Sequence, residues 1–222
     1  MSCAATEPPI RLLVVPGLND SGPAHWQSWL ESLHRDALRV RQDDWSRGEL
    51  ERWARRLQQT IESQPPARWA VAAHSFGCLT LARVAQLRPE LPIVAALLVA
   101  PASPERFGIA GLLPQQALPF RSTLVASRND PWLGFAEAER WALRWGSRFV
   151  DLGYAGHINA ESGFGPLPLA QRWLAAVRRH AVRGDGLTPH AHEADACVAP
   201  RWWRLAASSR SALAEARLAQ DA

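Results

Sequence analysis

Apolar residues recur along this chain in two alternating patterns. Short, almost uninterrupted apolar runs alternate with longer segments in which apolar residues return every three or four positions. The first pattern is typical of strands buried on both faces, and the second of amphipathic helices. The short runs predict strands at residues 11–15, 38–41, 69–73, 93–99, 121–126 and 148–150. The longer segments predict helices at residues 23–34, 49–63, 76–87, 135–145 and 167–180.

The order of these elements predicts the fold class. Strands and helices alternate, and no hairpin signal joins two strands, so we expect an α/β fold with a mostly parallel sheet and helices on both faces. The carboxyl ends of parallel strands meet at one edge, where α/β sheets hold their sites. This pattern predicts one domain over residues 1–183. From Gly184 the periodicity ends, and residues 184–222 are expected to form an accessory linker with a short helix, in part disordered.

The segment Ala-His-Ser-Phe-Gly at residues 73–77 lies where a predicted strand meets a predicted helix. Small-x-Ser-x-Gly in this setting is typical of a nucleophile elbow, a strained turn that presents a serine hydroxyl above the sheet. Gly77 and Ala73 supply the small residues that such a tight turn requires. The pattern also occurs by chance, and a serine after a strand is often a turn or helix-capping residue. The elbow therefore identifies Ser75 as a candidate nucleophile that needs support from elsewhere in the chain.

A serine nucleophile needs a general base and a carboxylate that orients the base. In α/β-hydrolases these follow the serine in the order acid, then histidine. Asp130 follows the strand at 121–126, and His157 lies in a glycine-flanked loop after the last predicted strand. Asp151 is a less favoured alternative acid, because it ends that strand only six residues before His157. The competing histidines are His25, His34, His74, His180, His190 and His192. Of these, His74 belongs to the elbow, with a side chain expected to point away from the pocket of the serine. His34 and His180 lie near predicted helix ends, and His190 and His192 lie in the linker.

An oxyanion hole in such a site is built from main-chain N–H groups. We expect one from Phe76, directly after the nucleophile, and one from Leu18 in the loop at residues 16–22. The alternative is that this loop is only a turn capped by Asp20 or Ser21.

Four segments together resemble the small serine hydrolases related to retinoblastoma-binding protein 9. These segments lie at residues 16–26, 73–77, 129–131 and 156–165. The resemblance covers residues 10–180 and implies a compact α/β-hydrolase fold without a large cap domain.

The same resemblance implies a catalytic triad of Ser75, Asp130 and His157. It also implies that His25 and Trp26 shape the pocket or pack beneath it. It does not extend to binding of the retinoblastoma protein, because the chain has no Leu-x-Cys-x-Glu segment.

These motifs predict a serine hydrolase that cleaves small ester substrates through an acyl-enzyme on Ser75. A thioesterase or amidase with the same triad, and a non-catalytic binding protein on a hydrolase scaffold, remain alternatives. The segment at residues 102–119, with Ile109, Leu113 and Leu118 among its apolar residues, is the expected pocket wall. Core packing is the alternative for each pocket candidate. The candidates are Phe107, Leu112, Trp132 and Phe164.

The composition bears on which partners the protein binds and on where in the cell it is expected. The net charge is +4 and every basic residue is arginine, spread over amphipathic segments, so a nucleic-acid surface is not expected. No apolar run approaches the roughly 20 residues that span a bilayer, and no membrane association is expected. Three scattered cysteines lack metal spacing and favour a reducing compartment, so we expect a cytoplasmic protein with no metal or cofactor. The oligomeric state is left open.

Overall fold

A computed structural model describes residues 7–182. The expected accessory segment at residues 184–222 lies outside the described residues. Among residues 7–182, no helix is long and apolar enough to cross a membrane.

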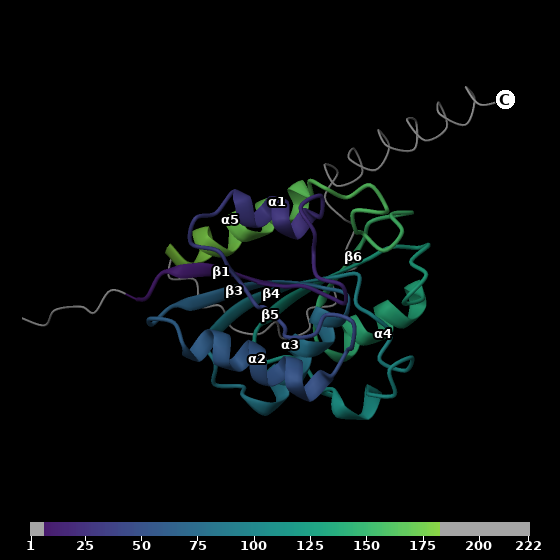
Figure 1. Ribbon diagram of the computed structural model, residues 1–222, viewed down its shortest axis with the longest axis horizontal. Helices are drawn as coiled ribbons and strands as arrows, with labels where there is room; N and C mark the ends of the chain where they lie inside the picture. The colour runs from purple at the N-terminus through teal and green to yellow at the C-terminus, as the bar shows by residue number, and fades with distance from the viewer. Residues whose placement is uncertain (1–6, 183–222) are drawn as a thin grey trace, which may run out of the picture.

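A sheet of parallel strands forms the centre of the described structure (Figure 1). Its strands are β1 (Ile10–Val15), β2 (Leu38–Arg39), β3 (Arg68–His74), β4 (Ile93–Val99), β5 (Arg121–Ala126) and β6 (Arg148–Asp151). They lie in the order β2-β1-β3-β4-β5-β6, and every neighbouring pair is parallel. The helices are α1 (Trp26–Ser32), α2 (Leu50–Glu62), α3 (Phe76–Leu87), α4 (Phe135–Arg144) and α5 (Pro168–Val182), with a 3₁₀ turn η1 (Ala110–Leu112). The predicted α/β fold class is confirmed.

Helices cover both faces of the sheet, as Figure 1 shows. Helices α1 and α5 lie over one face, and α2, α3 and α4 lie over the other. Side chains of one strand point alternately to the two faces. In β3, Val71 and Ala73 enter the core on the α2 side, whereas Ala70 and Ala72 enter the core on the α1 side. This burial on both faces explains why the strands read as continuous apolar runs.

The ends of several elements differ from the prediction. Helix α1 begins at Trp26 rather than Pro23, because His25 caps it: its Nδ1 accepts a hydrogen bond from the main-chain N–H of Gln27 at 3.1 Å. The η1 turn was not predicted, because its few residues carry no helical periodicity. The turn leads into Leu113, which is buried in the core on the α2 side, as is Leu118. Both leucines were wrongly expected to line a pocket.

The sheet has a topological switch point between β1 and β3. The chain leaves β1 for β2 at one edge and then returns to place β3 on the other side of β1. The loops after β1 and β3 therefore diverge at adjacent strand ends, which is where open α/β sheets bind their ligands.

The turn between β3 and α3 is tight and strained. Ser75 has φ 53° and ψ −123°, a left-handed conformation that is rare for a residue with a side chain. A Cβ atom on Gly77 would lie 2.4 Å from the carbonyl oxygen of Val15 and 2.5 Å from that of Pro16. A Cβ atom on Gly17 would lie 2.7 Å from the Cβ of Ser75. Only glycine lets the end of β1 lie against this turn.

Replacing Gly77 by Ala tests this backbone contact. The added methyl group would meet main-chain oxygens that cannot rotate away, so we expect the free energy of unfolding to fall by about 1–3 kcal/mol despite the better helix propensity of alanine. Thermal denaturation measures the loss. Gly111→Ala is the matched control, because nothing lies within 4 Å of its added Cβ. Equal stability of the two variants would contradict the close-contact account.

Candidate active site

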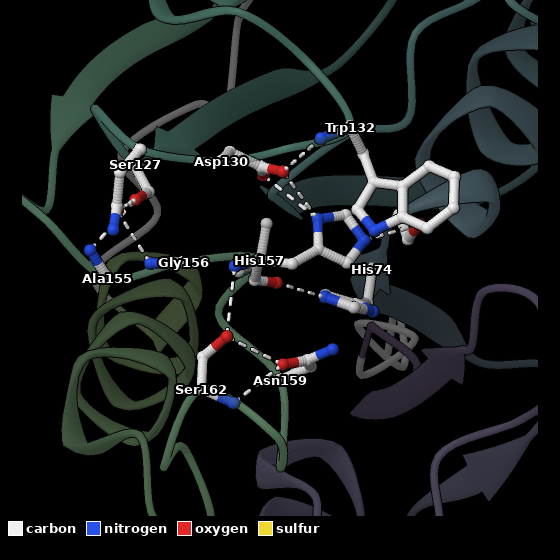
Figure 2. Close-up of polar contacts among 12 residues, drawn as sticks. His74, Ser127, Asp130, Trp132, Ala155, Gly156, His157, Asn159 and Ser162 are labelled. Carbon is white, nitrogen blue, oxygen red and sulfur yellow. Dashed lines mark hydrogen bonds and ion pairs between the residues drawn. The ribbon is translucent and has the colours of Figure 1, made fainter.

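Three side chains from separate strand ends lie in one hydrogen-bonded row. The Nε2 atom of His157 lies 2.9 Å from the Oγ of Ser75. Its Nδ1 lies 3.0 Å from both carboxylate oxygens of Asp130 (Figure 2). With a neutral imidazole, Nδ1–H donates to the carboxylate and Nε2 accepts the serine hydroxyl proton. The side chains of His157 and Asp130 are only 9% and 2% exposed, so water competes little for these bonds.

The loop that carries His157 is held from two sides. The main-chain N–H of His157 donates to the Oγ of Ser162 at 3.1 Å, and its carbonyl oxygen accepts from the Nε2 of His74 at 2.9 Å. Gly156 and Ile158, the two neighbours in the chain, both have positive φ. A Cβ on Gly156 would lie 2.4 Å from the Oγ of Ser162, so this position needs glycine for its space as well as its conformation.

Side chains next to the acid tie its loop to the histidine loop. The Oδ1 of Asn129 accepts from the Ser127 hydroxyl and from the main-chain N–H of Gly156, each at 2.8 Å. The Ser127 hydroxyl oxygen also accepts from the N–H of Ala155 at 2.9 Å. Figure 2 shows these bonds to one side of the imidazole. They fix the distance between the loop that carries the carboxylate and the loop that carries the base.

The alternative acid, Asp151, is engaged elsewhere. Its Oδ2 accepts from the guanidinium of Arg128 at 2.6 Å, and its Oδ1 accepts from the N–H of Gly153 at 2.8 Å. Asp130 instead faces the imidazole, and its Oδ1 also accepts from the main-chain N–H of Trp132 at 2.9 Å. The geometry therefore favours Asp130 as the partner of the base.

Of the two expected oxyanion donors, Phe76 directly follows the serine, and the loop that carries Leu18 lies against the same turn. Phe76 is the first residue of α3, so its N–H has no partner within the helix. Leu18 follows Gly17, where an added Cβ would lie 3.3 Å from the N atom of Phe76. The carboxylate of Asp20, the alternative cap of this loop, pairs with Arg39 at 2.9 Å.

A buried glutamine anchors the same loop to the sheet. The Nε2 of Gln27 donates to the carbonyl oxygens of Val15 at 3.1 Å and Ala72 at 2.9 Å, at the end of β1 and two residues before the end of β3. Its Oε1 accepts from the hydroxyl of Ser21 at 2.6 Å. Ser21 therefore bonds to this side chain rather than capping the turn. Gln27 is fully buried and uses its whole amide to join β1 and β3 close to the elbow.

Burial controls the charge of the groups around the row. It lowers the pKa of His25 to about 4, with a smaller contribution from the nearby Arg39, and it lowers the pKa of His74 well below its usual value. Both rings are therefore neutral near pH 7. Burial also raises the pKa of the Cys78 thiol, which is fully enclosed near Ser75, so it does not supply a competing thiolate. Residues 7–182 contain no cluster of three or more side chains arranged to hold a metal ion.

One of the four pocket candidates lies beside the base, and a second packs against the residue that follows the nucleophile. Trp132 is 48% exposed, and the centroid of its ring lies 6.1 Å from that of His157. Phe107 packs edge-on against Phe76, with centroids 4.8 Å apart. Leu112 lies near α3, where its carbonyl oxygen accepts from Arg83, and Phe164 packs against the core on the α1 side.

Sequence reasoning missed most of the polar contacts that hold the site together. His25 and Trp26 are the exception, because the resemblance implied that they shape the pocket or pack beneath it. Both pack against His74, whose ring centroid is 4.7 Å from that of His25 and 6.1 Å from that of Trp26. The side chain of His74 lies on the α1 side of the sheet, as its expected direction away from the serine requires. There it bonds to the main chain of His157, a contact that the sequence does not reveal. Serines and asparagines close in sequence to Asp130 and His157 are the residues from which these loop hydrogen bonds could have been expected. Those residues are Ser127, Asn129, Asn159 and Ser162.

Comparison with known proteins places this geometry in a family. A search of curated proteins found no match. Among solved structures, a putative YdeN-like hydrolase from Pectobacterium atrosepticum is 37% identical, covering 81% of this chain and 93% of its own, with a TM-score of 0.69. The ydeN gene product of B. subtilis is 18% identical, covering 77% and 98%, with a TM-score of 0.62, and thus shows the fold alone. RedJ, a thioesterase from Streptomyces coelicolor, is 16% identical, covering 81% and 95%, with a TM-score of 0.51.

The family model described as serine hydrolase matches residues 12–176, which include the elbow, the Asp130 loop and the His157 loop. The match spans well over half of the chain. This chain belongs to the serine hydrolase family.

Proposed function

We propose that this protein is a serine hydrolase that cleaves small ester substrates through an acyl-enzyme on Ser75. The observation that carries the proposal is the continuous row from Ser75 through His157 to Asp130, built on a strained strand-to-helix turn. A hydroxyl is a weak nucleophile until a base takes its proton. In this row the base lies within hydrogen-bond distance of the hydroxyl, and a carboxylate fixes the tautomer that the base needs.

The reaction follows from these contacts. Ser75 Oγ attacks the carbonyl carbon of the ester while its proton passes to Nε2 of His157. Asp130 stabilises the resulting imidazolium. The tetrahedral intermediate then expels the alcohol, which takes the proton from Nε2, and leaves an acyl group on Ser75. Water, deprotonated by His157, attacks this ester and releases the carboxylic acid and the free serine.

Main-chain N–H groups of Phe76 and Leu18 stabilise the negative oxygen of the intermediate. They act at the point where charge develops, so they lower the barrier rather than merely bind substrate. The contacts of Gly17 and Gln27 hold the two segments that present these groups. This arrangement acts on the acyl carbonyl alone and accepts several leaving groups.

Small esters with an apolar acyl group are the proposed substrates because aromatic side chains lie beside the elbow and the base. Trp132 and Phe107 offer aromatic surface next to His157 and Phe76. RedJ is a thioesterase by name, and an esterase domain from Rhodothermus marinus also shares the fold at 14% identity. Matched ester, thioester and aryl-amide substrates would rank these leaving groups by kcat/KM.

Replacing Ser75 by Ala removes the proposed nucleophile. We expect kcat for a short activated ester such as p-nitrophenyl acetate to fall by about 10⁴-fold or more, with folding intact. Steady-state hydrolysis and a circular dichroism spectrum measure the two properties. Ser32→Ala, at an exposed position in α1, is the control and should retain full activity. Substantial ester hydrolysis by the Ser75→Ala variant would contradict the proposal.

Replacing Asp130 by Asn distinguishes the two candidate acids. An amide cannot stabilise the imidazolium and favours the wrong tautomer, so we expect kcat to fall by about 10²–10⁴-fold. Asp151→Asn should stay within about twofold of the wild type, because its partner is the surface residue Arg128. Ester hydrolysis at neutral pH measures both variants. The reverse ranking of the two variants would reassign the acid.

A further inference from the structure

A buried histidine that takes no part in the proposed proton transfers contacts the base from behind. His74 is the last residue of β3, directly before Ser75, and its side chain is directed to the opposite side of the sheet from Phe76. Its Nε2 lies 2.9 Å from the carbonyl oxygen of His157. In Figure 2 the two rings lie next to each other, with a dashed line from His74 to the main chain of His157. One strand end thus carries the nucleophile and, one residue earlier, a contact to the base loop.

We propose that His74 is a positioning residue: its neutral imidazole donates Nε2–H to the carbonyl oxygen of His157 and so fixes the base toward Ser75. This inference rests on the proposed function of the row. His74 itself touches neither the substrate nor the reacting atoms. It acts through the main chain of His157.

The partner of His74 fixes its tautomer. A carbonyl oxygen can only accept, so Nε2 of His74 must carry the hydrogen. In a neutral ring, Nδ1 is then unprotonated. The residue is 5% exposed, and the rings of His25, Trp26 and His157 surround it, with centroids 4.7, 6.1 and 4.9 Å away. This packing leaves the ring little freedom to turn away from the carbonyl.

The surroundings also keep His74 neutral. Burial lowers its pKa most strongly, followed by the two imidazoles that face it, His25 at the start of α1 and His157. His25 is itself held neutral by burial. A neutral donor suits this position, because His157 becomes an imidazolium during the reaction and a second positive ring 4.9 Å away would oppose that charge.

The His157 loop needs such a contact. Its backbone adopts left-handed conformations on both sides of His157, at Gly156 and Ile158. Ser162 holds only the N–H of His157, and it belongs to the same loop. His74 holds the carbonyl of His157 from the end of β3, the strand that leads into the elbow. The bonds from Ser127 and Asn129 instead tie the neighbouring residues of this loop to the acid loop.

Three substitutions of His74 distinguish a role as hydrogen-bond donor from a role in packing alone. The amide nitrogen of glutamine lies four bonds from Cα, as does Nε2 of histidine, whereas that of asparagine lies three bonds away. We therefore expect His74→Gln to retain kcat for p-nitrophenyl acetate within about fivefold. His74→Leu and His74→Asn should lower kcat by about 10–100-fold with little change in KM, since a misplaced base slows chemistry rather than binding. His34→Gln, beside Arg178 at the far end of the sheet, is the control and should be unchanged.

Nuclear magnetic resonance of the ¹⁵N-histidine-labelled wild-type protein tests the tautomer without any substitution at His74. His74 should show a protonated Nε2 and an unprotonated Nδ1 from pH 5 to 8. A protonated Nδ1, or a charged ring within that range, would overturn the proposal. So would wild-type kcat in the leucine variant, or a folded glutamine variant as slow as the leucine variant. If the leucine variant fails to fold, the kcat values of the glutamine and asparagine variants and the nuclear magnetic resonance spectrum still test the proposal.

These outcomes are distinct from failure of the proposed function. Should the wild-type protein hydrolyse esters independently of Ser75, the function would be wrong whatever His74 does. Should Ser75 be essential while His74→Leu keeps full kcat, only the role of His74 would be wrong.

Discussion

The rest of the site depends on the close contact between the end of β1 and the turn after β3. At this contact two glycines, Gly17 and Gly77, let main chain lie against main chain with no room for another methyl group. The contact holds Ser75 in a left-handed conformation that the residue would not adopt alone. It also brings the loop with Leu18 next to the N–H of Phe76. One steric constraint thus places the proposed nucleophile and the proposed oxyanion donors together.

Buried polar side chains extend this arrangement from the elbow to the other loops. Gln27 bonds to β1 and β3 near their ends, Asn129 joins the acid loop to the histidine loop, and His74 joins β3 to His157. Each bond satisfies a main-chain group that would otherwise be costly to bury. The site therefore rests on side chains whose chemistry is not used in the reaction.

The sequence predicts the sheet well because its information is local. Apolar runs marked each strand, and the position of Ser75, Asp130 and His157 after three of them indicated which side chains the topology would bring together. Element ends were harder. The start of α1 depends on the ring of His25 as a cap, and η1 is too short to show a period.

What the sequence could not show depends on contacts between distant segments. Gln27 reads as an ordinary polar residue beside an apolar stripe, yet it is fully buried between two strand ends. Leu113 and Leu118 read as pocket residues because their segment follows a strand, yet they fill the core on the α2 side. A single sequence gives the side-chain types but not the partners that burial selects for them.

The central claim is that Ser75 is the nucleophile, and covalent labelling tests it most directly. The wild-type protein is treated with a fluorophosphonate, its residual ester hydrolysis is followed, and the modified peptide is identified by mass spectrometry. The account predicts one phosphonyl group per chain, on Ser75, in proportion to the activity lost. A label on another residue that accompanies inactivation, or full activity after Ser75 is labelled, would contradict it.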